Sequence, residues 1–281
     1  MKTIKVAAPA KINLTLEVLG KRDDGFHDIK SIMQAINLYD YLTFTTEDNF
    51  TNNIYLSGNS SVIPYDERNL IYKAIDKFLL ATGISGKKIS VYIEKNIPVE
   101  AGLAGGSTDA AATFVALNNL FAFPLSEEKI NELCASLGSD LNFCLNGGTA
   151  LCTGRGESIV PIDTPVLDIS LIKPLGFGIS AKEAYTKFSQ LPTEKKVVPN
   201  NTEKMCERFD VSLLYNSLEL AVINDYEELL DIKNKIPTSM MSGSGPTFFV
   251  LDNSVPFNFD KQRFLVIEGL KAIADGVRIV C

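Results

Sequence analysis

The sequence predicts an α+β fold divided into two domains, residues 1–160 and 161–281. Two observations lead to this fold class. Strand-like and helix-like segments are mixed along the chain, without the regular strand–helix alternation of a doubly wound parallel sheet. A turn at Asp163-Thr164-Pro165 then starts the pattern again, in a chain whose 281 residues suit either one large domain or two modest ones.

The first segment, Ile4 to Leu19, is predicted to be a strand with a break at Pro9. Apolar and polar side chains alternate along it, which is the pattern of a half-buried strand. The alternation places Lys11 and Asn13 on the same face, directed away from the core. A turn rich in charge and glycine follows and leads into Phe26-His27.

The later helices are predicted from apolar side chains that recur every three to four residues and from the residues that bound such runs. Gly83 ends the helix that starts at Asn69, and Ser126 and Gly138 bound another. Predicted helices cover residues 69–82, 110–121, 126–137, 181–188, 211–222 and 227–235, with a last helix before a C-terminal strand. Predicted strands cover residues 29–38, 89–93, 147–159 as a pair, and 166–172, and residues 190–204 form a polar loop.

The composition excludes some classes of partner. With 27 basic and 34 acidic residues the net charge is −7, and no basic run is longer than Lys87-Lys88 or Lys195-Lys196. Nucleic acid is therefore not an expected partner, because binding it requires a basic surface. A polyphosphate ligand would have to be held by local groups together with a divalent cation.

The cysteines and the apolar segments indicate the compartment. The five cysteines are odd in number and form no C-x-x-C pair, which argues against a zinc site or a disulfide framework and for a reducing cytosol. The N-terminus lacks the apolar core of a signal peptide, and no segment is long and apolar enough to span a membrane. We expect a cytoplasmic protein with no membrane partner, of an oligomeric state that the sequence leaves open.

The most informative segment is a glycine-rich loop that leads from Ile97 to Ala112 into a predicted helix. Glycine lets a ligand approach the backbone without meeting a Cβ, and the first N–H groups of a helix have no partner within it. The positive end of the helix dipole lies at the same point, so the loop is suited to hold an anion. It is not the common P-loop, because no Lys-Ser or Lys-Thr pair follows the glycines. A structural alternative is that Ser107 or Thr108 only caps the helix.

Three segments that are far apart in the chain form a set: Pro9–Leu14 with its extension Gly20–Ser31, the glycine loop, and Met241–Phe248. In order and spacing they resemble the GHMP kinases, the superfamily of galactose, homoserine, mevalonate and phosphomevalonate kinases. The resemblance extends from Pro9 to beyond Thr247. It implies a two-domain fold with the active site in the cleft between the domains.

The Lys-Arg-Asp-Asp-Gly-Phe-His extension brings the match closer to one branch of the superfamily. That branch implies ATP-dependent phosphorylation of the 2-hydroxyl of a methylerythritol carried on cytidine diphosphate, in the non-mevalonate isoprenoid pathway. Phosphoryl transfer depends mostly on positioning and charge stabilisation. The resemblance assigns the developing charge to Lys11 and the hydroxyl proton to Asp140. Without it, the two residues are interpreted as an exposed strand charge and the N-cap of the segment Leu141 to Leu145.

The resemblance also implies that the glycine loop binds the triphosphate of ATP, together with magnesium, and it names no protein ligand for the metal. The residues that it assigns to ATP are Asn69, Pro98, Val99, Glu100, Ala101, Gly102, Leu103, Ala104, Gly105, Gly106, Ser107 and Thr108.

The small-molecule substrate is assigned to Asn13, Phe26, His27 and Tyr185. His27 matches the position that reads the cytosine, while Phe26, where tyrosine is usual, and Tyr185 would stack on the base. The alternatives are a structural histidine and two aromatic side chains in ordinary core packing.

Four further positions depart from the family pattern. Ala104 replaces a glycine and limits how closely phosphate can approach, whereas Thr108 replaces a serine and keeps the hydroxyl for phosphate or magnesium. Asn142 replaces a proline, which would loosen the turn around Asp140, and Ala181 lacks a usual hydroxyl. None of these changes removes a catalytic group.

The sequence is also compatible with three other functions. A dinucleotide-binding oxidoreductase is suggested by Gly176-Phe-Gly178-Ile-Ser-Ala181, which fits G-x-G-x-x-A. Pro174 breaks the preceding strand, however, and no acidic residue about 20 positions on ends a second strand. A nucleotide sensor without catalysis is disfavoured by the presence of Lys11 and Asp140. The third alternative is a kinase of the same superfamily with a different substrate. The Phe26-His27 pair is the feature that distinguishes this chain from such a kinase.

Overall fold

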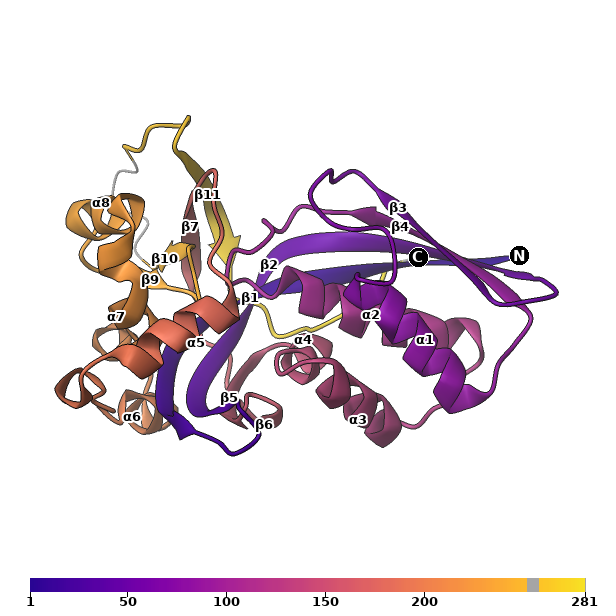
Figure 1. Cartoon of the computed structure of the whole chain (residues 1–281), viewed down its shortest axis with the longest axis horizontal. Coiled ribbons are helices and arrows are strands. Elements are labelled where there is room, and N and C mark those ends of the chain that lie inside the picture. Colours follow the sequence, from indigo (N-terminus) through magenta and orange to yellow (C-terminus); the bar gives the residue numbers. More distant parts are fainter. Residues whose placement is uncertain (252–257, 281) are drawn as a thin grey trace.

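Two layers of sheet and helix share one long hairpin, made of β1 (Lys2–Lys21) and β2 (His27–Asp48). The computed structural model describes residues 1–251 and 258–280. The two strands pair antiparallel along their length, so the hairpin runs through both halves of the molecule (Figure 1). The register of the pair shifts at several points, one of them after Pro9. Pro9 therefore produces an irregularity within a continuous strand, and the predicted break there is wrong.

The first layer is built on the larger sheet. Its further strands are β3 (Asn53–Gly58), β4 (Lys87–Glu94), β5 (Thr149–Gly154), β6 (Ser158–Ile162), β8 (Tyr215–Asn216) and β12 (Arg278–Ile279). Within the described residues the order is β12-β1-β2-β4-β3, with β5 joined to β2, β6 to β5, and β8 to β1. Its helices are α1 (Leu70–Thr82), α2 (Gly105–Leu120), α3 (Glu127–Leu137) and α4 (Leu141–Asn146). The helices lie together along one side of the sheet in Figure 1, around a core that includes the fully buried Phe44, Phe78 and Phe114.

The second layer is built on the smaller sheet. Its strands are β7 (Asp168–Pro174), β9 (Met240–Met241), β10 (Phe248–Val250) and β11 (Phe264–Lys271), in the order β11-β7-β10-β9. The accompanying helices are α5 (Ala181–Gln190), α6 (Asn201–Glu207), α7 (Ser217–Val222) and α8 (Glu227–Lys235), with 3-10 turns at Thr193–Lys195, Val211–Leu213 and Ile223–Asp225. Leu16, Val18 and Ile29 of the hairpin pack into the same core as α5, α7 and α8.

The predicted α+β class is confirmed, and so are several element boundaries. Asn69 caps α1 by accepting a hydrogen bond from the Ile71 N–H, and Gly83 ends it in the left-handed conformation. Ser126 caps α3 through the Lys129 N–H, and Gly138 follows the last turn. The strand β7 pairs antiparallel with both of its neighbours, which contradicts the parallel sheet of a dinucleotide-binding fold.

Other expectations are wrong. The sequence predicts a helix before the C-terminal strand, but the structure has the strand β11 there. Its backbone pairs antiparallel with β7. Part of the expected polar loop forms α6, and the helix predicted over residues 211–222 is reduced to α7 behind a short strand. No prediction covered β3, which pairs parallel with β4. In each case pairing or packing against a distant segment overrides the local pattern.

The domain division at residues 160 and 161 stays a prediction. That position falls within β6, and β8 and β12, which come from the second half of the chain, pair with β1. Within the described ranges, none of the helices combines the length and the apolar character that crossing a bilayer requires.

Candidate active site

A cavity of about 730 Å³ lies where elements of the two layers meet. Its walls come from β1, β2, the glycine loop, Ser139 and Asp140 just before α4, helix α5 and the turn between β9 and β10. The predicted site residues that line it are Lys11, Asn13, Phe26, His27, Gly102, Ala104, Ser107, Asp140 and Tyr185. Gly243 and Ser244 of the third segment line it as well. The fold therefore brings all three sequence segments to one cavity.

Lys11 is held rigidly on β1. Its side chain is only 4 % exposed, and its Nζ donates to Asn13 Oδ1 at 2.6 Å and to the Gly102 carbonyl at 3.1 Å. Asn13 in turn donates from Nδ2 to Ser31 Oγ at 2.8 Å. The expectation of a half-buried strand is corrected here, because apolar and polar residues of β1 are both covered. A buried ammonium needs such partners, since an unpaired charge in the interior is strongly unfavourable.

Asp140 occupies the N-cap position of α4, but its side chain makes no capping hydrogen bond. Its Oδ2 lies 3.6 Å from Lys11 Nζ, and the side chain is 30 % exposed. The turn after it is regular, with the Cys144 N–H donating to the Asp140 carbonyl at 2.9 Å, so Asn142 does not loosen it. The carboxylate consequently keeps acceptor capacity that faces the cavity.

The glycine loop is shorter than predicted, because α2 begins at Gly105 and not at Ala110. The N-cap of α2 is Ala104, which has φ 59° and makes no side-chain capping bond. Ser107 and Thr108 lie inside the first turn, so the alternative that one of them caps the helix is wrong. The first N–H groups of α2 are open in the way that an anion site requires.

Two loops interlock beside Lys11. A Cβ on Gly102, whose φ is +73°, would lie 2.1 Å from the Ser242 carbonyl oxygen. A Cβ on Gly243 would lie 3.0 Å from the Gly102 carbonyl and 3.2 Å from Lys11 Nζ. Ser242 Oγ also donates to the Gly102 carbonyl at 3.0 Å. The glycines in both segments thus allow the two backbones to meet at the lysine.

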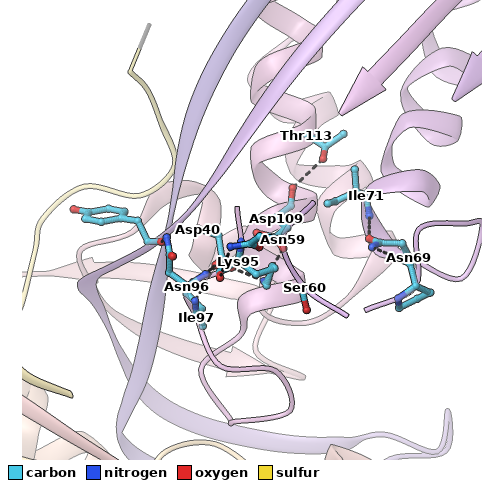
Figure 2. A network of polar contacts seen from close by, with 12 residues as sticks. Asp40, Asn59, Ser60, Asn69, Ile71, Lys95, Asn96, Ile97, Asp109 and Thr113 are labelled. Atoms are coloured by element: carbon cyan, nitrogen blue, oxygen red, sulfur yellow. Dashed lines mark hydrogen bonds and ion pairs between the residues drawn. The ribbon is translucent and has the colours of Figure 1, made fainter. Parts of the chain in front are cut away.

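A buried ion cluster lies behind the loop, and sequence reasoning missed it. Figure 2 shows Lys95 between Asp40 and Asp109, with Lys95 Nζ 2.8 Å from Asp109 Oδ2 and hydrogen-bonded to Asp40. Asp40 Oδ1 also accepts from the backbone N–H groups of Asn96 at 2.6 Å and Ile97 at 2.8 Å. The signal available in the sequence was the position of Lys95 at the end of an apolar strand and of Asp109 within an apolar helix.

Burial controls the charges of this cluster. Burial alone would lower the pKa of Lys95, but the charges of Asp109 and Asp40 more than offset it, and the net shift is upward. Burial raises the pKa of the Asp109 carboxyl, whose Oδ1 has no hydrogen-bond partner. The ammonium therefore stays charged and fixes β2, the entry to the loop and the second turn of α2 to one another.

Phe26, His27 and Tyr185 form the aromatic end of the cavity. His27 stacks on Tyr185 with ring centroids 4.9 Å apart, and its Nε2 lies 3.1 Å from Ser189 Oγ. Phe26 is half exposed, with the Arg155 guanidinium over its ring at 4.8 Å from the centroid. Burial, followed by the charges of Lys21 and Lys196, lowers the pKa of His27. Arg155 also lines the cavity, and the sequence reasoning did not identify it.

Some residues assigned to ATP do not reach this cavity. Asn69 uses its amide within the protein, accepting from the Ile71 N–H and donating to the Pro64 carbonyl at 2.7 Å (Figure 2). Thr108 is fully buried, and its hydroxyl has no hydrogen-bond partner. The other assigned residues outside the cavity lining are Pro98, Val99, Glu100, Ala101, Leu103, Gly105 and Gly106. Their contacts with ATP stay predictions.

Comparison with known proteins adds to the geometry. Residues 69–149 match the family model described as the GHMP kinases N terminal domain. A 4-diphosphocytidyl-2-C-methyl-D-erythritol kinase from Bacillus licheniformis is 40 % identical over 289 residues, which cover 97 % of this chain and 94 % of the relative. The enzyme of the same name from Clostridium botulinum is 41 % identical over 258 residues, covering 88 % and 90 % of the two chains.

Solved structures show the same fold. A crystal structure of 4-(cytidine 5'-diphospho)-2C-methyl-D-erythritol kinase superposes with a TM-score of 0.77 at 26 % identity, over 96 % of this chain and 99 % of that one. Homoserine kinase from Cytophaga hutchinsonii has a TM-score of 0.79 at 19 % identity, over 100 % and 98 % of the two chains, and shows the fold alone. The chain therefore belongs to the GHMP kinases, in the family of the 4-diphosphocytidyl-2-C-methyl-D-erythritol kinases, and is a small-molecule kinase.

Proposed function

We propose that this chain transfers the γ-phosphoryl group of ATP to the 2-hydroxyl of 4-diphosphocytidyl-2-C-methyl-D-erythritol. One observation carries the proposal: Lys11 and Asp140 face each other in a cavity that has an open helix start at one side and aromatic rings at the other. The relatives that carry this substrate in their names align with almost the whole chain, which supports the same acceptor.

The triphosphate of ATP binds at the start of α2. Ala104 and Ser107 line the cavity there, and the N–H groups of the first turn donate to phosphate oxygens. The ammonium of Lys95 lies directly behind this turn, 3.1 Å from where a Cβ on Gly105 would be. Its ion pairs with Asp40 and Asp109 hold this turn of α2 in place beside the cavity.

Lys11 and Asp140 act on the acceptor hydroxyl and the transferred group. Asp140 orients the hydroxyl and accepts its proton as the oxygen attacks phosphorus. Lys11 stabilises the negative charge that spreads over the transferred phosphoryl oxygens. The hydrogen bonds from Lys11 to Asn13 and Gly102 fix the ammonium before substrate binds, so little reorganisation accompanies the reaction.

Magnesium fits this site as an ion that arrives with the nucleotide. The described residues contain no group of three or more His, Cys, Asp or Glu side chains that could hold a metal by themselves. Mg²⁺ prefers oxygen ligands and binds through one or two carboxylates plus substrate phosphates. Asp140 and the Ser107 hydroxyl are oxygen donors on the cavity wall that would hold it. When bound, the ion would neutralise charge on the phosphates.

The cytidine end of the substrate binds at Phe26, His27 and Tyr185. Arg155 covers one face of Phe26, so a base that stacks on this ring uses the other face. A base that stacks on Tyr185 takes the place that the His27 ring occupies here. His27 would then turn its ring nitrogens toward the polar edge of the base.

We place the reaction in the cytoplasm and limit the partners to small molecules. Within the described part of the chain Cys134, Cys144, Cys152 and Cys206 are free thiols, which fits a reducing compartment. Cys281 lies outside the described residues.

The decisive experiment is an ADP-release assay with the purified chain and four alcohols. We expect turnover with 4-diphosphocytidyl-2-C-methyl-D-erythritol and background rates with mevalonate, galactose and homoserine. Mass spectrometry and phosphorus NMR of the product would locate the new phosphate on the 2-hydroxyl. Turnover with one of the other alcohols in preference would show that the proposed acceptor is wrong.

A further inference from the structure

The segment Gly176–Ala181, whose glycines match a dinucleotide motif, makes a contact that the proposed reaction does not yet explain. A Cβ built on Gly178 would lie 2.5 Å from Glu100 Cβ and 3.0 Å from the Glu100 carbonyl oxygen. Contacts of a Cβ below 3.0 Å essentially do not occur, and ordinary contacts begin at 3.4 Å. Gly178 is therefore required here because the segment presses against Glu100 of the glycine loop.

The same segment is fixed to the second layer. Lys173 Nζ donates to the carbonyls of Pro174 at 3.0 Å and Phe177 at 3.2 Å. Phe177 stacks on Tyr226 with centroids 4.9 Å apart and planes 8° apart. Such contacts hold the backbone in one conformation, so the segment behaves as a stiff spacer.

The segment continues into the helix that carries Tyr185. Ser180 caps α5 by accepting from the Glu183 N–H at 3.1 Å, and Ser244 Oγ donates to the Ile179 carbonyl at 3.2 Å. The segment Gly176–Ala181 thus touches the glycine loop at Glu100 and the third sequence segment at Ser244, and it leads into α5. These three elements surround the cavity on different sides.

We infer that Gly178 is a positioning residue that sets the distance between the glycine loop, which binds ATP, and the acceptor-binding helix α5. The inference rests on the proposed function, because it places the γ-phosphate on one side of this contact and the cytidine substrate on the other. An alanine at position 178 forces the two backbones apart by about 1 Å, the difference between 2.5 Å and an ordinary 3.4 Å contact. A misplacement of about 1 Å between reacting groups costs on the order of 100-fold in rate.

The test is steady-state kinetics on wild type, Gly178→Ala and Glu100→Gly/Gly178→Ala. We expect Gly178→Ala to lower kcat about 10-fold to 100-fold, with both KM values within about threefold, because each ligand keeps its own contacts. Glu100→Gly removes the Cβ that the new methyl group meets, and glycine suits the φ of 50° at position 100. The double variant should therefore recover most of the lost kcat.

Two further variants complete the design. Gly20→Ala is the matched control, because a Cβ on Gly20 meets nothing within 4 Å. Phe177→Leu removes the stacking on Tyr226 and should lower kcat several-fold, which tests the spacer even where Gly178→Ala does not fold.

The outcomes separate this inference from the proposed acceptor. An unchanged kcat in Gly178→Ala, a loss that the double variant fails to restore, or, where Gly178→Ala does not fold, an unchanged kcat in Phe177→Leu would overturn the inference. A wild-type chain that phosphorylates another alcohol would overturn the proposed function only. Kinetics of the wild type and the same variants, measured with that alcohol as substrate, would still decide the role of Gly178.

Discussion

The burial of Lys11 explains how a single lysine becomes a useful electrostatic group. In water an ammonium is well solvated and contributes little, whereas in the interior its field is strong and its position is fixed. Its partners are Asn13, the Gly102 carbonyl and, at 3.6 Å, Asp140. The separation from Asp140 is longer than a direct hydrogen bond, so the carboxylate stays able to bind the acceptor hydroxyl.

Asp140→Asn and Lys11→Ala should each lower kcat by about 10²–10³-fold, the loss typical of one oriented group that stabilises transition-state charge. Asp140 makes no capping bond, so Asp140→Asn should also melt at nearly the wild-type temperature. Circular dichroism melts alongside ADP-release kinetics provide the check. Near wild-type turnover in either variant would refute the role that we assign to that residue.

His27→Ala should raise KM for the cytidine substrate several-fold and leave KM for ATP nearly unchanged. It removes the ring nitrogens that would pair with the polar edge of the base, and the unpaired base edge weakens binding of this substrate alone. The pKa of His27 lies below its ordinary value of about 6.5, so the ring is neutral at pH 7 and becomes charged only under more acidic conditions. In wild type, KM for the cytidine substrate should therefore rise only below about pH 6.5. An equal rise for both substrates in the variant would place His27 outside the base site.

At the scale of the elements, the start of α2 depends on groups that do not touch ligand. Ala104 adopts a left-handed conformation that favours glycine, and no side chain caps the helix. The Lys95 cluster compensates by joining the loop entry and α2 through buried charges (Figure 2). Removing one partner of such a cluster leaves an unpaired buried charge, which costs about 3–5 kcal/mol.

Gly105→Val should weaken ATP binding and lower stability together. Its side chain would point away from the cavity, into Lys95 Nζ and Ile97 Cγ2, each 3.1 Å from the new Cβ. The turn would have to move to relieve this overlap, at a cost of about 1–3 kcal/mol. Calorimetric titration with a non-hydrolysable ATP analogue and urea denaturation measure the two effects.

Gly106→Ala is the comparison for that experiment, since its Cβ would meet only Leu70 Cδ1 at an ordinary 3.7 Å. It should cost clearly less stability than Gly105→Val. Equal losses in the two variants would show that crowding at Lys95 is not the cause.

At the scale of the whole molecule, the hairpin of β1 and β2 belongs to both layers. Val6 and Phe44 pack with α1 and α2, whereas Leu16 and Ile29 pack with α5 and α7. The chain end returns to the first sheet, where β12 pairs with β1. Neither layer therefore has a core that is independent of the other.

Heat should accordingly unfold the chain in one cooperative transition. The shared hairpin transmits the loss of either core to the other, so the calorimetric and van't Hoff enthalpies should agree to a ratio close to one. Differential scanning calorimetry of the ligand-free chain makes this measurement. Two resolved transitions would show that the layers are independent domains, with a boundary near the one that the sequence predicts.

The sequence alone determined the α+β class, the main caps and the three segments that identify a kinase. These depend on local rules: Asn69 and Ser126 accept hydrogen bonds from the N–H groups just after them, and the glycines of the loop permit close backbone approach. The order of the segments along the chain was sufficient for the family.

Only the tertiary structure decided which charges are buried and what the glycines contact. The ion cluster of Asp40, Lys95 and Asp109 and the contact of Gly178 with Glu100 join residues from different elements, so no local pattern contains them. The same holds for β11, whose strand conformation depends on pairing with β7, and for His27, whose ring lies on Tyr185 of a distant helix. Pairing and packing energies between distant segments exceed the small local preferences, and they are fixed only when the chain is folded.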